Sequence, residues 1–122
     1  MNIVSGHSGG LVVRAETNYS GYYFRLSTDG TVLGRRVTVD AQNTANYTPL
    51  FAGRSAAVNT GNNQFNTITV IMRGSDMSMY INQQFVFKAS DRAYKSGAVG
   101  VFADSDASSS EIVFRNAQVW KL

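Results

Sequence analysis

The sequence predicts an all-β protein, a sandwich or a barrel of short antiparallel strands. Apolar and polar residues alternate with a period of two in several segments, most regularly in 65–73 and 77–82. Turn signals such as Thr28-Asp29-Gly30 and Gly74-Ser75-Asp76 separate such segments. No window of about 11 residues keeps helical spacing of apolar residues without a Gly or β-branched interruption. Many short strands joined by turns are typical of β-sandwiches and barrels.

The expected strands follow one another in two series. The first contains the apolar run 11–15 and a hairpin formed by the aromatic-rich 21–26 and its partner 31–37. Residues 38–64 are rich in Asn, Thr, Ala and Gly, and we expect loops there with one or two short strands. The second series is expected at 65–73, 77–82, 85–89, 98–103 and 111–122.

Composition excludes several classes of protein. The chain has 122 residues, a net charge of +3 and no cysteine, which removes disulfides, thiol nucleophiles and iron–sulfur clusters. No apolar run is long enough to span a bilayer, and the first residues lack the pattern of a signal peptide. The basic residues are spread along the chain, which disfavours a nucleic-acid partner. We expect one domain over residues 9–122, preceded by a flexible segment, residues 1–8.

No catalytic or metal centre is evident among the titratable residues. The only histidine, His7, lies in a Gly/Ser stretch that does not predict a catalytic triad. Glu16 and Glu111 are the only glutamates, and they do not form a recognisable acid/base pair. Asp104 and Asp106 are weak candidates for Ca²⁺ ligands, but the EF-hand pattern is absent and an ordinary solvated loop is favoured. The sequence therefore predicts no cofactor, and Ca²⁺ is the one weak candidate.

Alternation sorts the side chains into a core face and a polar face. If 11–16, 22–27, 65–73 and 77–82 share one sheet, Tyr22 lies on the core face. Aromatic rings stack on the C–H faces of sugars, and Arg, Asn and carboxylates bond to hydroxyls. The polar face is therefore either a sugar site or an ordinary solvated face with cross-strand pairs, and the sequence does not decide between them. The polar face would hold Arg14, Glu16, Tyr23, Arg25, Thr69, Arg73, Tyr80 and Asn82.

Three segments carry a resemblance to a known superfamily. They are GGLVVRAETNYSGYYFRLSTDGTVLGRR, NTITVIMRGSDMSMYINQQFVFKASDRAYKSGAVGVFA and the closing IVFRNAQVWKL. Their order resembles concanavalin A-like (laminin-G-like) jelly-roll domains, including carbohydrate-binding modules of glycan-degrading enzymes. The resemblance covers about residues 9–122 and implies a jelly roll that binds sugar. It implies as ligand-binding residues Arg14, Glu16, Tyr22, Tyr23 and Arg25.

The chain departs from this superfamily in two places. Asn82-Gln83-Gln84 stands where a glycine-containing turn is usual, so a less suited residue occupies a position of positive φ. Only about nine residues precede the first matching strand, where such domains carry several strands. Either the chain is a fragment, or another chain, such as a second copy, completes the sandwich.

The sequence therefore predicts a non-catalytic carbohydrate-binding or adhesion module. Its expected partner is a glycan, without nucleic-acid binding or membrane insertion; an extracellular or cell-surface location is expected if it belongs to a larger secreted protein. The alternatives are a small glycan hydrolase and a structural domain that recognises protein. The expected ligand-binding residues are Arg14, Glu16, Tyr22, Tyr23, Arg25, Arg73 and Tyr80.

Overall fold

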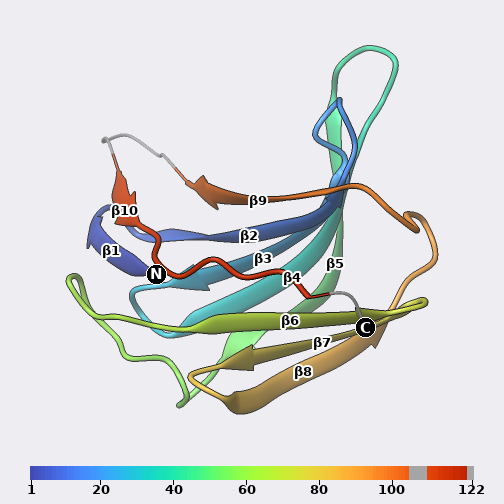
Figure 1. The fold of residues 1–122 in the computed structure, drawn as a ribbon. Coiled ribbons are helices and arrows are strands. Elements are labelled where there is room, and N and C mark those ends of the chain that lie inside the picture. Colours follow the sequence, from blue (N-terminus) through green and yellow to red (C-terminus); the bar gives the residue numbers. More distant parts are fainter. Residues whose placement is uncertain (105–109, 121–122) are drawn as a thin grey trace.

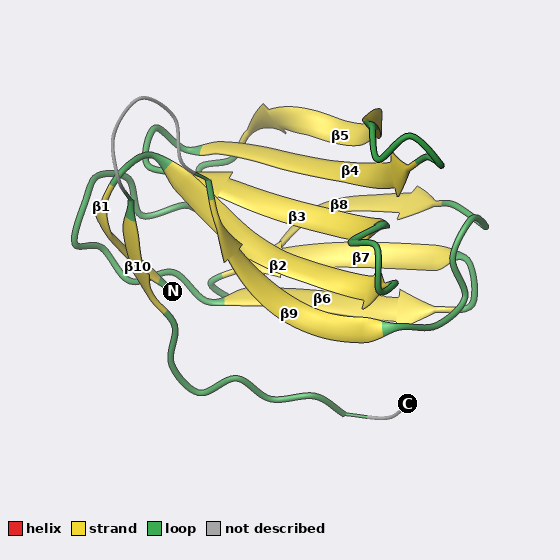
Figure 2. Cartoon of the chain, turned by 90° about the horizontal axis from the view of Figure 1, so that it is seen from above, coloured by secondary structure: helices red, strands yellow, loops and turns green. Residues whose placement is uncertain are grey.

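A computed structural model describes residues 1–104 and 110–120 as a sandwich of antiparallel sheets (Figure 1). A five-stranded sheet in the order β5-β4-β3-β2-β9 lies over a three-stranded sheet in the order β6-β7-β8 (Figure 2), and β1 pairs with β10. No helix that could span a membrane occurs in these two ranges. The strands are β1 (Asn2–Ser5), β2 (Ser8–Ala15), β3 (Gly21–Ser27), β4 (Thr31–Val39), β5 (Ala45–Arg54), β6 (Ile68–Arg73), β7 (Asp76–Ile81), β8 (Gln84–Ser90), β9 (Ala98–Ala103) and β10 (Glu111–Val113).

The predicted fold class, an all-β sandwich, is confirmed, and two strand lengths differ from expectation. β5 is a ten-residue edge strand within the irregular segment 38–64. Its residues are mostly exposed, so its sequence carries little alternation, and a shift in register lets the strand accommodate Pro49. The expected last strand, 111–122, is only three residues long.

The expectation that four strands share one polar face is wrong. Residues 11–16 and 22–27 belong to the large sheet, whereas 65–73 and 77–82 belong to the small sheet. Alternation identifies the buried face of each strand but not the sheet to which that strand belongs. The predicted ligand-binding residues are therefore divided between different surfaces.

The core lies between β3 of the large sheet and β7 of the small sheet. The inward side chains of both strands are at most 1% exposed, as alternation predicts. Phe87 of β8 stacks on Phe51 with ring centroids 4.6 Å apart and lies over Gly34, where a Cβ would come within 2.5 Å of the ring. The inward residues of β3 and β7 are Tyr22, Phe24, Leu26, Met77, Met79 and Ile81.

The N-terminal residues belong to the sandwich, in contrast to the flexible segment expected for residues 1–8. Asn2–Ser5 forms β1, and Ile3 is a core residue with 3% exposure. The N-terminal ammonium of Met1 donates a hydrogen bond to the carbonyl of Asn66 at 2.8 Å. So short a strand, paired with distant β10, gives no local periodicity from which it could be predicted.

One margin of the large sheet is incompletely covered. Val99 and Val101 of β9 are 52% and 49% exposed, although Val101 pairs with Leu11 on the inward face. In the described part of the chain, β9 is an edge strand of the large sheet, and β6 is an edge strand of the small sheet. That a second chain completes the sandwich stays a prediction, and light scattering at high concentration tests it.

Replacing Gln83 by glycine is expected to raise the free energy of unfolding by about 0.5–1 kcal/mol. Asn82 and Gln83 have φ values of 51° and 65° in the β7–β8 turn, as the sequence predicts, and glycine adopts this conformation without strain. Urea unfolding measures the change. Asn82→Gly is the control, because the Asn82 side chain accepts from Thr67 N (2.9 Å) and donates to Ala57 O (2.8 Å). A gain from both substitutions would contradict this explanation.

Candidate functional site

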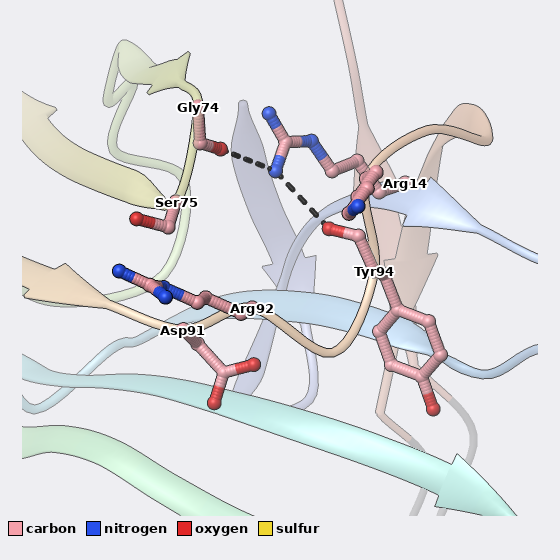
Figure 3. A pocket seen from close by; sticks show the side chains of 7 residues that line it. Arg14, Gly74, Ser75, Asp91, Arg92 and Tyr94 are labelled. Carbon is pink, nitrogen blue, oxygen red and sulfur yellow. Dashed lines mark hydrogen bonds between the residues drawn. The ribbon is translucent and has the colours of Figure 1, made fainter.

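An open pocket of about 480 Å³ lies at one end of the sandwich (Figure 3). Three segments form it: the end of β2, the β6–β7 turn and the loop between β8 and β9. We call it the end pocket. Its lining residues are Arg14, Gly74, Ser75, Asp91, Arg92, Tyr94 and Lys95.

Arg14 reaches this pocket because β2 is irregular at its end. Arg14 has a φ of 51°, and the pairing of β2 with β9 shifts register between Val12 and Ala15. This bulge turns the side chain away from strict alternation. The Arg14 Nη1 donates to the carbonyls of Gly74 at 2.8 Å and Tyr94 at 3.1 Å (Figure 3). Arg14 thus joins the three segments that form the pocket.

Asp91 anchors the β8–β9 loop. Its carboxylate forms an ion pair with Arg36 at 2.7 Å and accepts hydrogen bonds from the Tyr22 hydroxyl at 2.6 Å and from Ala93 N at 3.0 Å. The Asp91 amide donates to Ser75 O at 2.9 Å, which attaches the loop to the β6–β7 turn. Through the bond from Ala93 N, Asp91 caps this loop. With its side chain only 10% exposed, Asp91 is chiefly a structural anchor.

Opposing effects act on the ionisation of this group. Burial raises the pKa of the Asp91 carboxyl. The hydrogen bonds from Tyr22 and Ala93 and the charge of Arg36 together lower this pKa by more, so it lies below its ordinary value. Burial, and then the bond to Asp91, raise the pKa of the Tyr22 hydroxyl. Both directions favour a carboxylate accepting from a neutral phenol.

Tyr94 is fixed from both ends. Its amide donates to the Tyr22 hydroxyl at 3.2 Å, and its own hydroxyl lies 2.9 Å from Thr38 Oγ1. The Tyr94 ring packs edge-on against the Tyr22 ring, with centroids 5.6 Å apart. Hydrogen bonds at the backbone and at the hydroxyl therefore both hold Tyr94 in the pocket wall.

The structure brings only part of the predicted ligand-binding set to this pocket. Arg14 lines it, and Arg73 directly precedes the lining residue Gly74. Tyr22 is 0% exposed, as its core position predicts, and acts from behind the pocket through its hydroxyl. Glu16 is exposed in the β2–β3 turn.

The other three predicted residues lie on the outer faces of the two sheets. Tyr23 and Arg25 pair with Val12 and Gly10 on the outer face of the large sheet, where the Tyr23 ring contacts Phe102 at 5.3 Å. Tyr80 lies on the small sheet, with its ring 5.7 Å from that of Phe85. These residues do not form one site with Arg14.

Sequence reasoning missed most of the pocket lining. Asp91, Arg92, Tyr94 and Lys95 all lie in the β8–β9 loop. The signal available for them was the segment DRAYKSG, which supported the family resemblance but was not assigned to ligand binding. Loop residues have no periodicity that indicates which neighbours they meet.

Asp104, one of the two weak Ca²⁺ candidates, bonds to other residues of the protein. The Asp104 carboxylate accepts from Ser8 Oγ at 2.9 Å and pairs with Arg25 at 3.4 Å. Asp106 lies outside the described residues. Within residues 1–104 and 110–120, no group of three acidic or imidazole side chains is placed to hold a metal.

Comparison with known proteins gives one similarity of fold. The chain matches no protein-family model and no curated protein sequence. It is similar to the solved structure of the carbohydrate-binding module CBM66 from Bacillus subtilis, with a TM-score of 0.65 and 14% sequence identity. The likeness covers 82% of this chain and 60% of that structure, so this chain spans less than two thirds of its length. At this identity, the likeness establishes a shared β-sandwich fold.

Proposed function

We propose that the protein is a non-catalytic carbohydrate-binding or adhesion module and that the end pocket is its glycan site. The observation that supports this most directly is a pocket of about 480 Å³, walled by Arg14 and Tyr94, on a fold shared with a carbohydrate-binding module. That volume is within the range of small-ligand sites. Guanidinium N–H groups bond to sugar oxygens, and an aromatic ring offers a face for sugar C–H groups.

The rigidity of the pocket supports the same proposal. Arg14, Asp91 and Tyr94 are each bonded to more than one segment. A wall already ordered in the free protein loses little conformational freedom on binding, which favours affinity for a small, polar ligand.

The outer face of the large sheet is a second candidate for sugar binding. There the Arg35 guanidinium stacks on the Tyr47 ring at 4.4 Å, and Arg35 pairs across the strands with Tyr23. Tyr47 is 57% exposed, so its ring is accessible. A flat face of this kind suits a polymer chain, whereas the end pocket suits one sugar unit or a chain end.

A glycan array followed by two pairs of variants tests the proposal and separates these surfaces. We expect bound glycans to be lost or weakened several-fold in Arg92→Ala and Lys95→Ala, and retained in Tyr23→Ala and Arg25→Ala. Circular dichroism confirms folding of each variant. The opposite pattern would move the site to the outer face, and no glycan binding by the folded protein would favour the protein-recognition alternative.

The hydrolase alternative has a separate test. Glu16 follows the end of β2, whereas Glu111 pairs with Ser5 near the beginning of β2, so the two carboxyl groups lie at opposite ends of the strand. Glycosidases place their paired carboxyl groups within about 10 Å. Release of reducing sugar from a bound glycan, lost in Glu16→Gln, would overturn the non-catalytic proposal.

A further inference from the structure

We propose that the end pocket selects acidic sugars, in which a carboxylate or sulfate group on the ring is the recognised feature. This inference rests on the proposed function, because it names the class of glycan that the same pocket binds. It follows from the balance of charges in the pocket and from the balance of hydrogen-bond donors and acceptors.

The pocket lining carries an excess of positive charge. Arg14, Arg92 and Lys95 contribute three cations, and Asp91 is the only lining carboxylate. Asp91 does not neutralise them, because it already pairs with Arg36 behind the pocket at 2.7 Å. Neither Glu16 nor Asp76 is a lining residue. A ligand with one negative charge is therefore attracted at close range by three cations.

Two of these cations project from an exposed loop. Arg92 and Lys95 are exposed, and in the described part of the chain neither forms a hydrogen bond or an ion pair. Figure 3 shows the Arg92 guanidinium on the same side of the pocket as Ser75. Cations without a protein partner remain available to a ligand.

Four acceptor groups of the pocket lining already accept hydrogen bonds. The carbonyls of Gly74 and Tyr94 accept from Arg14, the carbonyl of Ser75 accepts from Asp91 N, and the Asp91 carboxylate accepts from Tyr22, Ala93 and Arg36. A neutral sugar presents hydroxyl groups that must donate as well as accept. A carboxylate or sulfate group only accepts, which suits a wall composed mainly of unused donors.

Arg14 is oriented for such a group. Its two bonds to backbone carbonyls hold the guanidinium plane and use two of its five N–H donors. A fixed guanidinium is suited to paired hydrogen bonds with a planar carboxylate or with a sulfate. Arg14 would position the anionic group, and Arg92 and Lys95 would strengthen its attraction.

Three oligosaccharide probes test the inference by calorimetry on the full chain. They are an oligogalacturonate, its fully methyl-esterified form and a sulfated galactan oligosaccharide. We expect the oligogalacturonate to bind about tenfold more tightly than its ester, with an affinity that falls as salt rises. The sulfated probe distinguishes a general anion site from one shaped for a carboxylate.

Arg92→Gln and Lys95→Gln are each expected to weaken acid binding about two- to fivefold and to weaken ester binding less. Arg54→Gln is the matched control, because it removes the same charge away from the pocket. Arg54 pairs with Thr31 at one end of β4, whereas Thr38, which contacts Tyr94 of the pocket, lies at the other end. Equal binding of acid and ester overturns the inference and leaves the proposed function standing. Absence of binding to every probe and to the glycan array overturns both.

Discussion

Asp91→Asn is expected to lower the free energy of unfolding by about 2–4 kcal/mol. The substitution keeps the size of the side chain but leaves Arg36 without its counter-ion and places an amide among donors from Tyr22 and Ala93. Breaking a largely buried ion pair is costly because one desolvated charge remains unpaired. Urea unfolding at neutral pH measures the loss. Asp29→Asn, the same chemical change at an exposed ion pair of 3.9 Å, is the control and should have little effect.

The Asp91 contribution should also depend on pH in a definite direction. The pKa of Asp91 in the folded state lies below its ordinary value, so folding favours the ionised form. The stabilisation is complete above the unfolded-state pKa of about 3.9 and is lost as pH falls through the lower folded-state value. The difference in the free energy of unfolding between the wild type and Asp91→Asn should therefore shrink as pH falls from 5 toward 2. The pH dependence of this difference should correspond to the titration of about one group. A constant difference would contradict the ion-pair explanation.

How far the sequence predicts the fold depends on where its periodicity is clear. Alternation in the segment that forms β3 predicted that Tyr22 lies on the core face, and Tyr22 is fully buried. The pattern could not show that β6 and β7 form a separate sheet, since pairing between strands is a long-range property. β1 was missed for the same reason, because its partner β10 lies more than a hundred residues away along the chain.

The candidate site was less predictable than the fold because it is assembled from chain ends and turns. Arg14 was singled out as a residue on a regular strand, yet it reaches the end pocket only through a bulge with φ of 51°. Tyr22 was correctly placed on the core face, but its bond to Asp91 could not be foreseen from residues 69 positions apart. The basic loop residues Arg92 and Lys95 form a cationic pocket lining only together with Arg14. No local sequence pattern indicates that these residues lie close together.

Gly97→Ala is expected to lower the free energy of unfolding by about 2–4 kcal/mol and to abolish glycan binding at the end pocket. Gly97 has a φ of 150°, which side-chain-bearing residues rarely adopt. A Cβ at this position would lie 2.5 Å from the backbone carbon of Arg14 and 2.6 Å from the carbonyl oxygen of Ala15. Because both contacts are to backbone, relief requires the β8–β9 loop to move away from the bulge that presents Arg14.

A control glycine separates this crowding from backbone strain alone. Gly61 also has a positive φ, 99°, but the nearest atom to its added Cβ is the flexible Gln64 Cγ at 4.0 Å. Gly61→Ala should therefore lose about 1 kcal/mol of stability and keep full glycan binding. If Gly97→Ala is no worse than Gly61→Ala in urea unfolding and calorimetry, close contact between the loop and the bulge does not form the site. A larger loss confined to Gly97 would show that the site depends on this approach of two backbones, which only glycine permits.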